Sequence, residues 1–242
     1  MMHVLMIIFT YFCNLFKFRK DTDMSKITIN NSKADKFHKQ TNNDRSPFVA
    51  CFPTSMINAA ETVRVIFPEE PSKTSYYTQE EDQYDWFLHT DADVVNFWNR
   101  PQYKHLLDAG SDPREIWDVE HYAFNKWIGH DVCKLTYNLT VEKILEVINN
   151  GGAVVTSGIF NNLRHLVCIV GYIANRIEGN LDKTAKDASQ ITNFIVDDSY
   201  GNPHTGYKPV GVDGNDVVWD KNEFLDLIRK DGGKYWGIIF DN

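Results

Sequence analysis

Three residue types in this sequence can together perform nucleophilic catalysis: a cysteine, a histidine and an aspartate. Cys51 precedes a run in which Met56 and Val63 recur at helical spacing, and Pro53 fits the first turn of such a helix. The N–H groups at a helix start stabilise the negative charge of a thiolate. They can also bind the oxyanion that forms when a thiolate attacks a carbonyl. The position of Cys51 therefore indicates a nucleophile.

A cysteine nucleophile needs a histidine that accepts and returns its proton, and a third group that orients the imidazole. His165 opens an apolar run that reads as a strand, and Asp197 and Asp198 end the next such run. Two neighbouring antiparallel strands can place His165 beside one of these aspartates. Taken singly, each residue also has a structural interpretation, as a buried hydrophobe, a core histidine or turn formers.

The other cysteines are poorer candidates for this chemistry. Strand alternation places Cys168 on the opposite face from His165, and Cys133 follows neither a helix start nor a histidine strand. With Cys13, the four cysteines form no C-x-x-C pair, which argues against a disulfide framework or a cysteine-rich zinc site.

A metal or organic cofactor is not expected. His121, His130 and Cys133 have a loosely ligand-like spacing, but a fourth ligand for tetrahedral zinc is missing. Nucleophilic catalysis by a cysteine, a histidine and an aspartate also needs no metal and no organic cofactor.

The chain length, 242 residues, and the content of hydrophobic (43%) and charged (24%) residues are those of a globular protein. The net charge of -8 argues against nucleic acid as a partner. We expect an N-terminal extension or polar arm over 1–39 and one domain over 40–242. That domain contains an acidic, aromatic helical insertion at about 68–130, which carries 13 acidic against 4 basic residues over 68–120.

The secondary-structure pattern predicts helices first and an antiparallel sheet afterwards, which is an α+β fold. Besides the helix from about 51 to 67, helices are expected at about 79–89, 91–99, 113–128 and 139–150, with one more after Asp220. Strands are expected at 152–158, 165–172, 191–198, 210–219 and 235–240.

The apolar run 4–16 is too short to span a bilayer as a helix, and it lacks the charge pattern of a signal peptide. Met24 opens a polar segment that reads as an ordinary start, so 1–23 are interpreted as an upstream extension. We expect a cytoplasmic protein, or a secreted or membrane-associated one if the apolar run acts as an anchor.

The segments ACFPTSMINAA, LRHLVCIVGY and FIVDDSYGN resemble the cysteine, histidine and aspartate blocks of the papain-like cysteine peptidases. They are most similar to the bacteriocin-processing, double-glycine-leader peptidases and their stand-alone bacterial and phage relatives. The resemblance covers about residues 40–60 and 150–202. It implies a nucleophile on the N-terminus of a central helix, packed on an antiparallel sheet that carries the histidine and the aspartate.

Residue by residue, the resemblance assigns the nucleophile to Cys51, the general base and acid to His165 and the orienting role to Asp198. Asp198 is preferred to Asp197 because an aromatic residue and a glycine follow it at the family's spacing, although Ser199 replaces the family's proline. The family places an oxyanion-binding glutamine ahead of the cysteine. Here the candidates for that role are Asn42, Asn43 and Gln40, with Asn42 nearest to the expected position.

The resemblance implies hydrolysis of a peptide or related amide bond through a thioacyl intermediate. The substrate would be a peptide, a protein or the peptide part of peptidoglycan, and no cofactor is implied. Two alternatives stay open: an acyltransferase or deamidase with the same triad, and a non-catalytic binding module on the same fold.

Overall fold

The computed structural model describes residues 26–43, 47–48, 50–68, 92–110, 116–177, 182–229 and 235–241. The apolar run 4–16 and the helix expected at 79–89 lie outside these ranges. None of the helices in the described ranges is long and apolar enough to span a bilayer.

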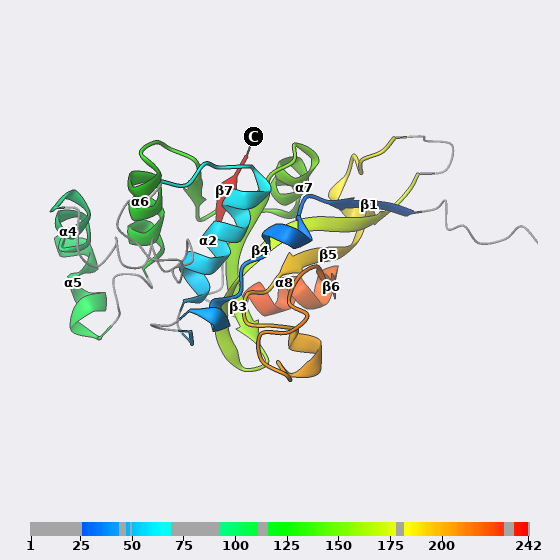
Figure 1. The fold of residues 1–242 in the computed structure, drawn as a ribbon. Coiled ribbons are helices and arrows are strands. Elements are labelled where there is room, and N and C mark those ends of the chain that lie inside the picture. Colours follow the sequence, from blue (N-terminus) through cyan, green and yellow to red (C-terminus); the bar gives the residue numbers. More distant parts are fainter. Residues whose placement is uncertain are drawn as a thin grey trace, which may run out of the picture.

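One seven-stranded antiparallel sheet organises the described residues (Figure 1). Its order is β2-β7-β3-β4-β5-β6, and β1 pairs with β4 beyond the end of β3. The strands are β1 (Lys26–Asn30), β2 (Lys134–Thr136), β3 (Ala153–Phe160), β4 (Leu163–Asn175), β5 (Ile191–Asp197), β6 (Val217–Asp220) and β7 (Gly237–Phe240). Together with the helices, this sheet confirms the predicted α+β class.

The helices are α2 (Cys51–Thr62), α4 (Ala92–Trp98), α5 (Pro101–Asp108), α6 (Trp117–Ile128), α7 (Val141–Asn149) and α8 (Lys221–Arg229). The N-terminal position of Cys51 in α2 is as predicted. The helix ends earlier than its apolar run, because Arg64 has a left-handed φ of 61°. Asp220 caps α8 as its sequence pattern indicates, by accepting from the backbone N–H groups of Asn222 and Glu223.

The prediction of a strand over 210–219 was wrong in its first part, since β6 begins only at Val217. Turns occupy the preceding residues, where Gly211, Asp213 and Asp216 have positive φ angles. Strands β1 and β2 and helix α5 were not predicted. Each is short: β1 has five residues, although Ile27 and Ile29 alternate with polar residues in it, β2 has three and α5 has eight.

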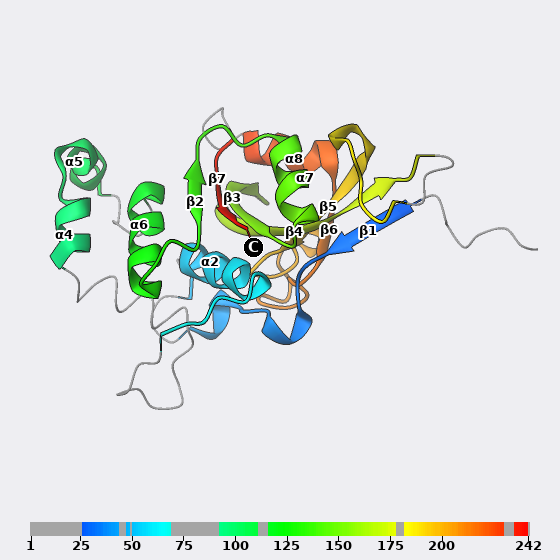
Figure 2. The same ribbon diagram turned by 90° about the horizontal axis from the view of Figure 1, so that it is seen from above.

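Helices cover both faces of the sheet (Figure 2). On one face, α7 and α8 pack over a core that includes Ile144, Val167 and Phe224. On the other, α2 and α6 pack over a core that includes Met56 and Phe124. Helices α4 and α5 lie beyond α6, away from the sheet (Figures 1 and 2). They share with α6 a smaller apolar cluster of Val94, Tyr103, Ile116, Val119 and Ala123.

Alternation along β4 assigns its side chains to the two faces. Val167 and Ile169 belong to the core under α7 and α8, whereas Leu166, Cys168 and Val170 belong to the core under α2 and α6. His165 lies against Phe160 and Tyr207 of the first core. Cys168 therefore points away from His165, as predicted.

Helix α2 contacts the edge of β4 along the stretch where β5 does not pair with it. The pairing of β4 with β5 begins at Cys168 opposite Asp197, so the part of β4 that carries His165 is paired with β3 alone among the described strands. On the open edge, the Ser55 hydroxyl donates to the Leu166 carbonyl at 3.0 Å, and both residues are buried. This bond ties α2, one turn after Cys51, to the part of β4 that carries His165.

Ser55→Ala should lower the free energy of unfolding by about 1–3 kcal/mol, because the buried Leu166 carbonyl loses its partner. Urea unfolding measures this loss. The matched control is Thr62→Val in the same helix, where the lost hydroxyl bonds only its own helix at the Asn58 carbonyl. If both variants lose the same unfolding free energy, the hydrogen bond between α2 and β4 stabilises the protein no more than a hydrogen bond within α2.

Candidate active site

Three elements bring the predicted residues together where β4 loses its β5 partner. His165 comes from β4, Asp198 follows the last residue of β5, and Cys51 begins α2. His165 and Asp198 are buried, at 5% and 0% exposure, and Cys51 is partly exposed. The thiol is thus the member of the group that a second molecule can reach.

His165 is held by Asp198 on one side of its ring. The Nε2 atom of His165 lies 2.8 Å from Oδ1 of Asp198. Because Nε2 is engaged in this bond, Nδ1 is the ring nitrogen left for Cys51. The structure thus brings Asp198, rather than Asp197, to the imidazole.

The Asp198 carboxylate accepts hydrogen bonds at both oxygens. Oδ1 also accepts from the Tyr200 backbone N–H at 3.0 Å, and Oδ2 accepts from the Tyr207 hydroxyl at 3.0 Å. The Asp198 backbone N–H donates to the Gly214 carbonyl at 2.7 Å. A Cβ at position 214 would lie 2.0 Å from the Asp198 carbonyl oxygen, so this close approach requires glycine. The carboxylate is therefore fixed in one orientation.

The charge state of His165 follows from these neighbours. Burial alone would lower the pKa of His165, but the Asp198 charge and hydrogen bond, with smaller contributions of the same kinds from Cys51, raise it from 6.5 to about 10. The imidazole is therefore protonated at neutral pH. It donates from Nε2 to Asp198 and presents its other N–H to Cys51.

Asp197 has a different environment. Its carboxylate accepts from the Ser32 hydroxyl at 2.9 Å and from the Asp216 backbone N–H at 2.9 Å. Burial raises its pKa to about 7, and these two bonds only partly offset that rise. Asp197 therefore links the segment after β1 to the turn before β6, on the sheet face opposite to His165.

Aromatic rings surround the imidazole. Phe160, Tyr200 and Tyr207 place their ring centroids 6.4, 6.1 and 6.2 Å from that of His165, in edge-on arrangements. Phe48, just ahead of Cys51, is 75% exposed and lies edge-on to Tyr200. An exposed aromatic ring therefore lies next to Tyr200, one of the three rings around the imidazole.

The three candidates for oxyanion binding differ in placement. Gln40 is buried, and its side chain accepts from the Ser199 hydroxyl at 2.7 Å and donates to the Pro47 carbonyl at 2.9 Å. Gln40 thus joins the segment after Asp198 to the segment before Cys51. Asn43 is also buried, whereas Asn42 is exposed. The assignment of the oxyanion role to Asn42, the candidate nearest to the expected position in the sequence, stays a prediction.

Three residues that support the site were missed from sequence. Tyr207 and Gly214 lie in an irregular segment after Asp198, where no periodicity links them to the triad. The only available signal was their closeness in sequence to Asp198. Ser55 was also missed, although its position one turn after Cys51 places it on the same helix face.

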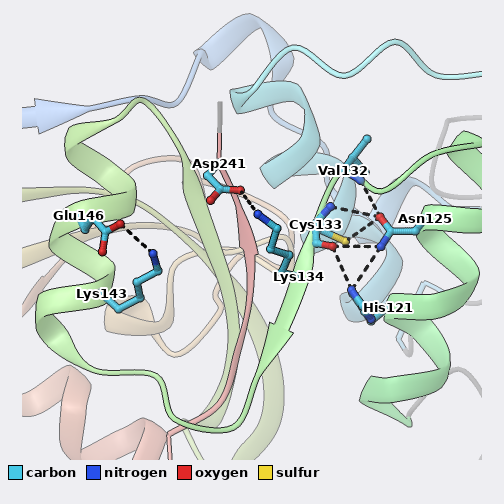
Figure 3. A network of polar contacts seen from close by, with 8 residues as sticks. All are labelled: His121, Asn125, Val132, Cys133, Lys134, Lys143, Glu146 and Asp241. Carbon is cyan, nitrogen blue, oxygen red and sulfur yellow. Dashed lines mark hydrogen bonds and ion pairs between the residues drawn. The ribbon is translucent and has the colours of Figure 1, made fainter.

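A second polar network lies apart from these residues, between α6 and β2 (Figure 3). Asn125 accepts from the backbone N–H and the thiol of Cys133, and His121 contacts the Cys133 carbonyl at 3.0 Å. Burial, followed by the charges of Glu120 and Asp131, raises the pKa of the Cys133 thiol well above its ordinary value. In the described ranges, no group of three or more His, Cys, Asp or Glu side chains can hold a metal.

The sequence matches no protein-family model and no curated protein.

The raised pKa of His165 predicts a pH-dependent contribution to stability. The folded state holds the proton more tightly than the unfolded state, so the contribution is complete below about pH 6.5 and is lost as the pH rises through about 10. The stability advantage of the wild type over His165→Gln should therefore shrink across this range in denaturant titrations. His204→Gln, at an exposed ring against Trp219, is the control. A constant advantage of the wild type over His165→Gln would contradict the ion pair.

Proposed function

We propose that this protein is a cysteine-dependent hydrolase of papain-like fold that cleaves a peptide or related amide bond. The observation that carries the proposal is the position of His165, which is hydrogen-bonded to Asp198 at 2.8 Å and interacts with Cys51 at the start of α2. A base, an orienting carboxylate and a partly exposed thiol are the parts that nucleophilic catalysis requires. The resemblance of the three sequence blocks to papain-like peptidases supports the same assignment.

In the first half of the reaction, the Cys51 thiolate attacks the substrate carbonyl carbon and an oxyanion forms. The His165 imidazolium then donates its Nδ1 proton to the departing amine, the carbon–nitrogen bond breaks, and a thioester remains on Cys51. In the second half, neutral His165 takes a proton from water, whose oxygen attacks the thioester. The tetrahedral intermediate then collapses, the carbon–sulfur bond breaks and the carboxylic acid product leaves, which restores the Cys51 thiolate and the His165 imidazolium.

The oxyanion would be bound by backbone N–H groups at the start of α2. Ala50 provides no side-chain cap for this helix, and Pro53 has no N–H, so the amides of Cys51 and Phe52 are the donors of the first turn. Gln40 would supply a side-chain donor, since its Nε2 carries a second hydrogen besides the one given to Pro47.

The acylated enzyme could also be resolved by an amine, which would make the protein an acyltransferase. Peptide libraries incubated with and without a primary amine such as cadaverine separate the two reactions. Hydrolysis gives the free acid in both incubations, whereas acyl transfer gives the cadaverine amide. A binding module on the same fold would give neither product.

Cys51 should react with iodoacetamide at pH 6 at least about 100-fold faster than Cys133 and Cys168, because only Cys51 is paired with an imidazolium and accessible. Burial raises the pKa of the other two thiols well above its ordinary value. Peptide mass mapping measures all three rates in one sample. In His165→Ala the advantage of Cys51 should disappear. A Cys51 that reacts like a free thiol in the wild type would remove the basis of the proposal.

Gln40→Ala should lower the rate of substrate hydrolysis about 100- to 1000-fold and leave the alkylation of Cys51 intact, since alkylation forms no oxyanion. The comparison variants are Asn42→Ala and Asn43→Ala, with hydrolysis measured on a peptide selected from the library. A larger loss in Asn42→Ala than in Gln40→Ala would assign the donor to Asn42 instead.

A further inference from the structure

Resting on this proposed function, we infer that Tyr207 is a positioning residue. Its hydroxyl orients the Asp198 carboxylate that holds His165 and stabilises the negative charge of that carboxylate. The Tyr207 hydroxyl donates to Oδ2 of Asp198 at 3.0 Å, and both side chains are buried. With Oδ2 bound in this way, Oδ1 is the oxygen directed at the imidazole. Tyr207 thus acts on catalysis through Asp198, without touching the reacting atoms.

The backbone at Tyr207 supports this role. Its φ is 60°, in the left-handed region that bulky residues rarely adopt. Glycine would adopt this backbone conformation without strain. The interactions of the tyrosine side chain must therefore offset the free-energy cost of the left-handed φ. The ring also packs edge-on against His165 and, at 5.1 Å between centroids, against Tyr200. These contacts hold the Tyr207 ring in the orientation in which its hydroxyl reaches Asp198.

The phenol also remains a donor over the working pH range. Burial, followed by the charge and hydrogen bond of Asp198, raises the pKa of Tyr207 far above its ordinary value. A neutral hydroxyl next to a buried carboxylate stabilises the ionised form of that carboxylate. Removing the hydroxyl should take one hydrogen bond from the Asp198 carboxylate and so weaken its hold on the imidazolium.

The test compares wild type, Tyr207→Phe and Tyr172→Phe in the full chain, with iodoacetamide alkylation of Cys51 followed from pH 4 to 9. In Tyr207→Phe, the acidic limb of the rate profile should move up by roughly one pH unit, the size expected for one lost hydrogen bond to a charged group. Tyr172→Phe is the matched control, since its buried hydroxyl bonds Asn149 and Ala185 away from this site. It should change stability and leave the profile in place.

If the profile of Tyr207→Phe superimposes on that of the wild type, the role of Tyr207 is overturned and the hydrolase proposal stands. If wild-type Cys51 shows no His165-dependent reactivity at all, the hydrolase proposal fails and the role of Tyr207 fails with it. If Tyr207→Phe does not fold, 3-fluorotyrosine at position 207 keeps the ring and is a stronger donor. The acidic limb should then move down, and an unchanged or raised limb would overturn the inference.

Discussion

The burial of the Asp198 carboxylate is the constraint on which the rest of the site depends. An ionised carboxylate that is removed from water costs several kcal/mol unless charged and hydrogen-bonding partners replace the lost hydration. Those partners are the His165 imidazolium, the Tyr200 backbone N–H and the Tyr207 hydroxyl, from β4 and from the irregular segment after β5. That segment must therefore fold back over the sheet end, which explains its left-handed residues and the close approach at Gly214.

The second requirement is the open edge of β4. A strand with two neighbours over only part of its length leaves backbone groups to be satisfied elsewhere. Here β5 turns away after Asp197, and the Ser55 hydroxyl of α2 donates to the buried Leu166 carbonyl. The same departure of β5 creates the opening through which Cys51 reaches His165. Pairing of β5 along the whole of β4 would close this edge and separate the thiol from the imidazole.

The fold class, the start of α2 and the two faces of β4 could be predicted from sequence, because each depends on a local period or on a helix start. Strand order predicted that His165 pairs with Asp197 or Asp198, and the family resemblance favoured Asp198. Tyr207 and Gly214 could not be predicted, since their contacts with Asp198 depend on the path of an irregular segment. The burial of the three amides also could not be predicted, because spacing along the chain does not show that Gln40 and Asn43 are buried and Asn42 is exposed.

Solvent exposure decreases through the site, from the partly exposed Cys51 to His165, which is 5% exposed, and to Asp198, which is fully buried. This gradient has a chemical consequence. The charge of the carboxylate acts on the imidazole in surroundings of low polarity, where electrostatic interactions are stronger than in water, while the thiol keeps the access that an attacking group needs. In the proposed hydrolase a substrate would approach from the exposed side of Cys51, and exposed Phe48 lies edge-on to Tyr200, which in turn lies edge-on to His165. Under the proposed function, a peptide with an apolar side chain near the scissile bond would fit these rings better than a highly charged one, since charged groups would lose hydration against them.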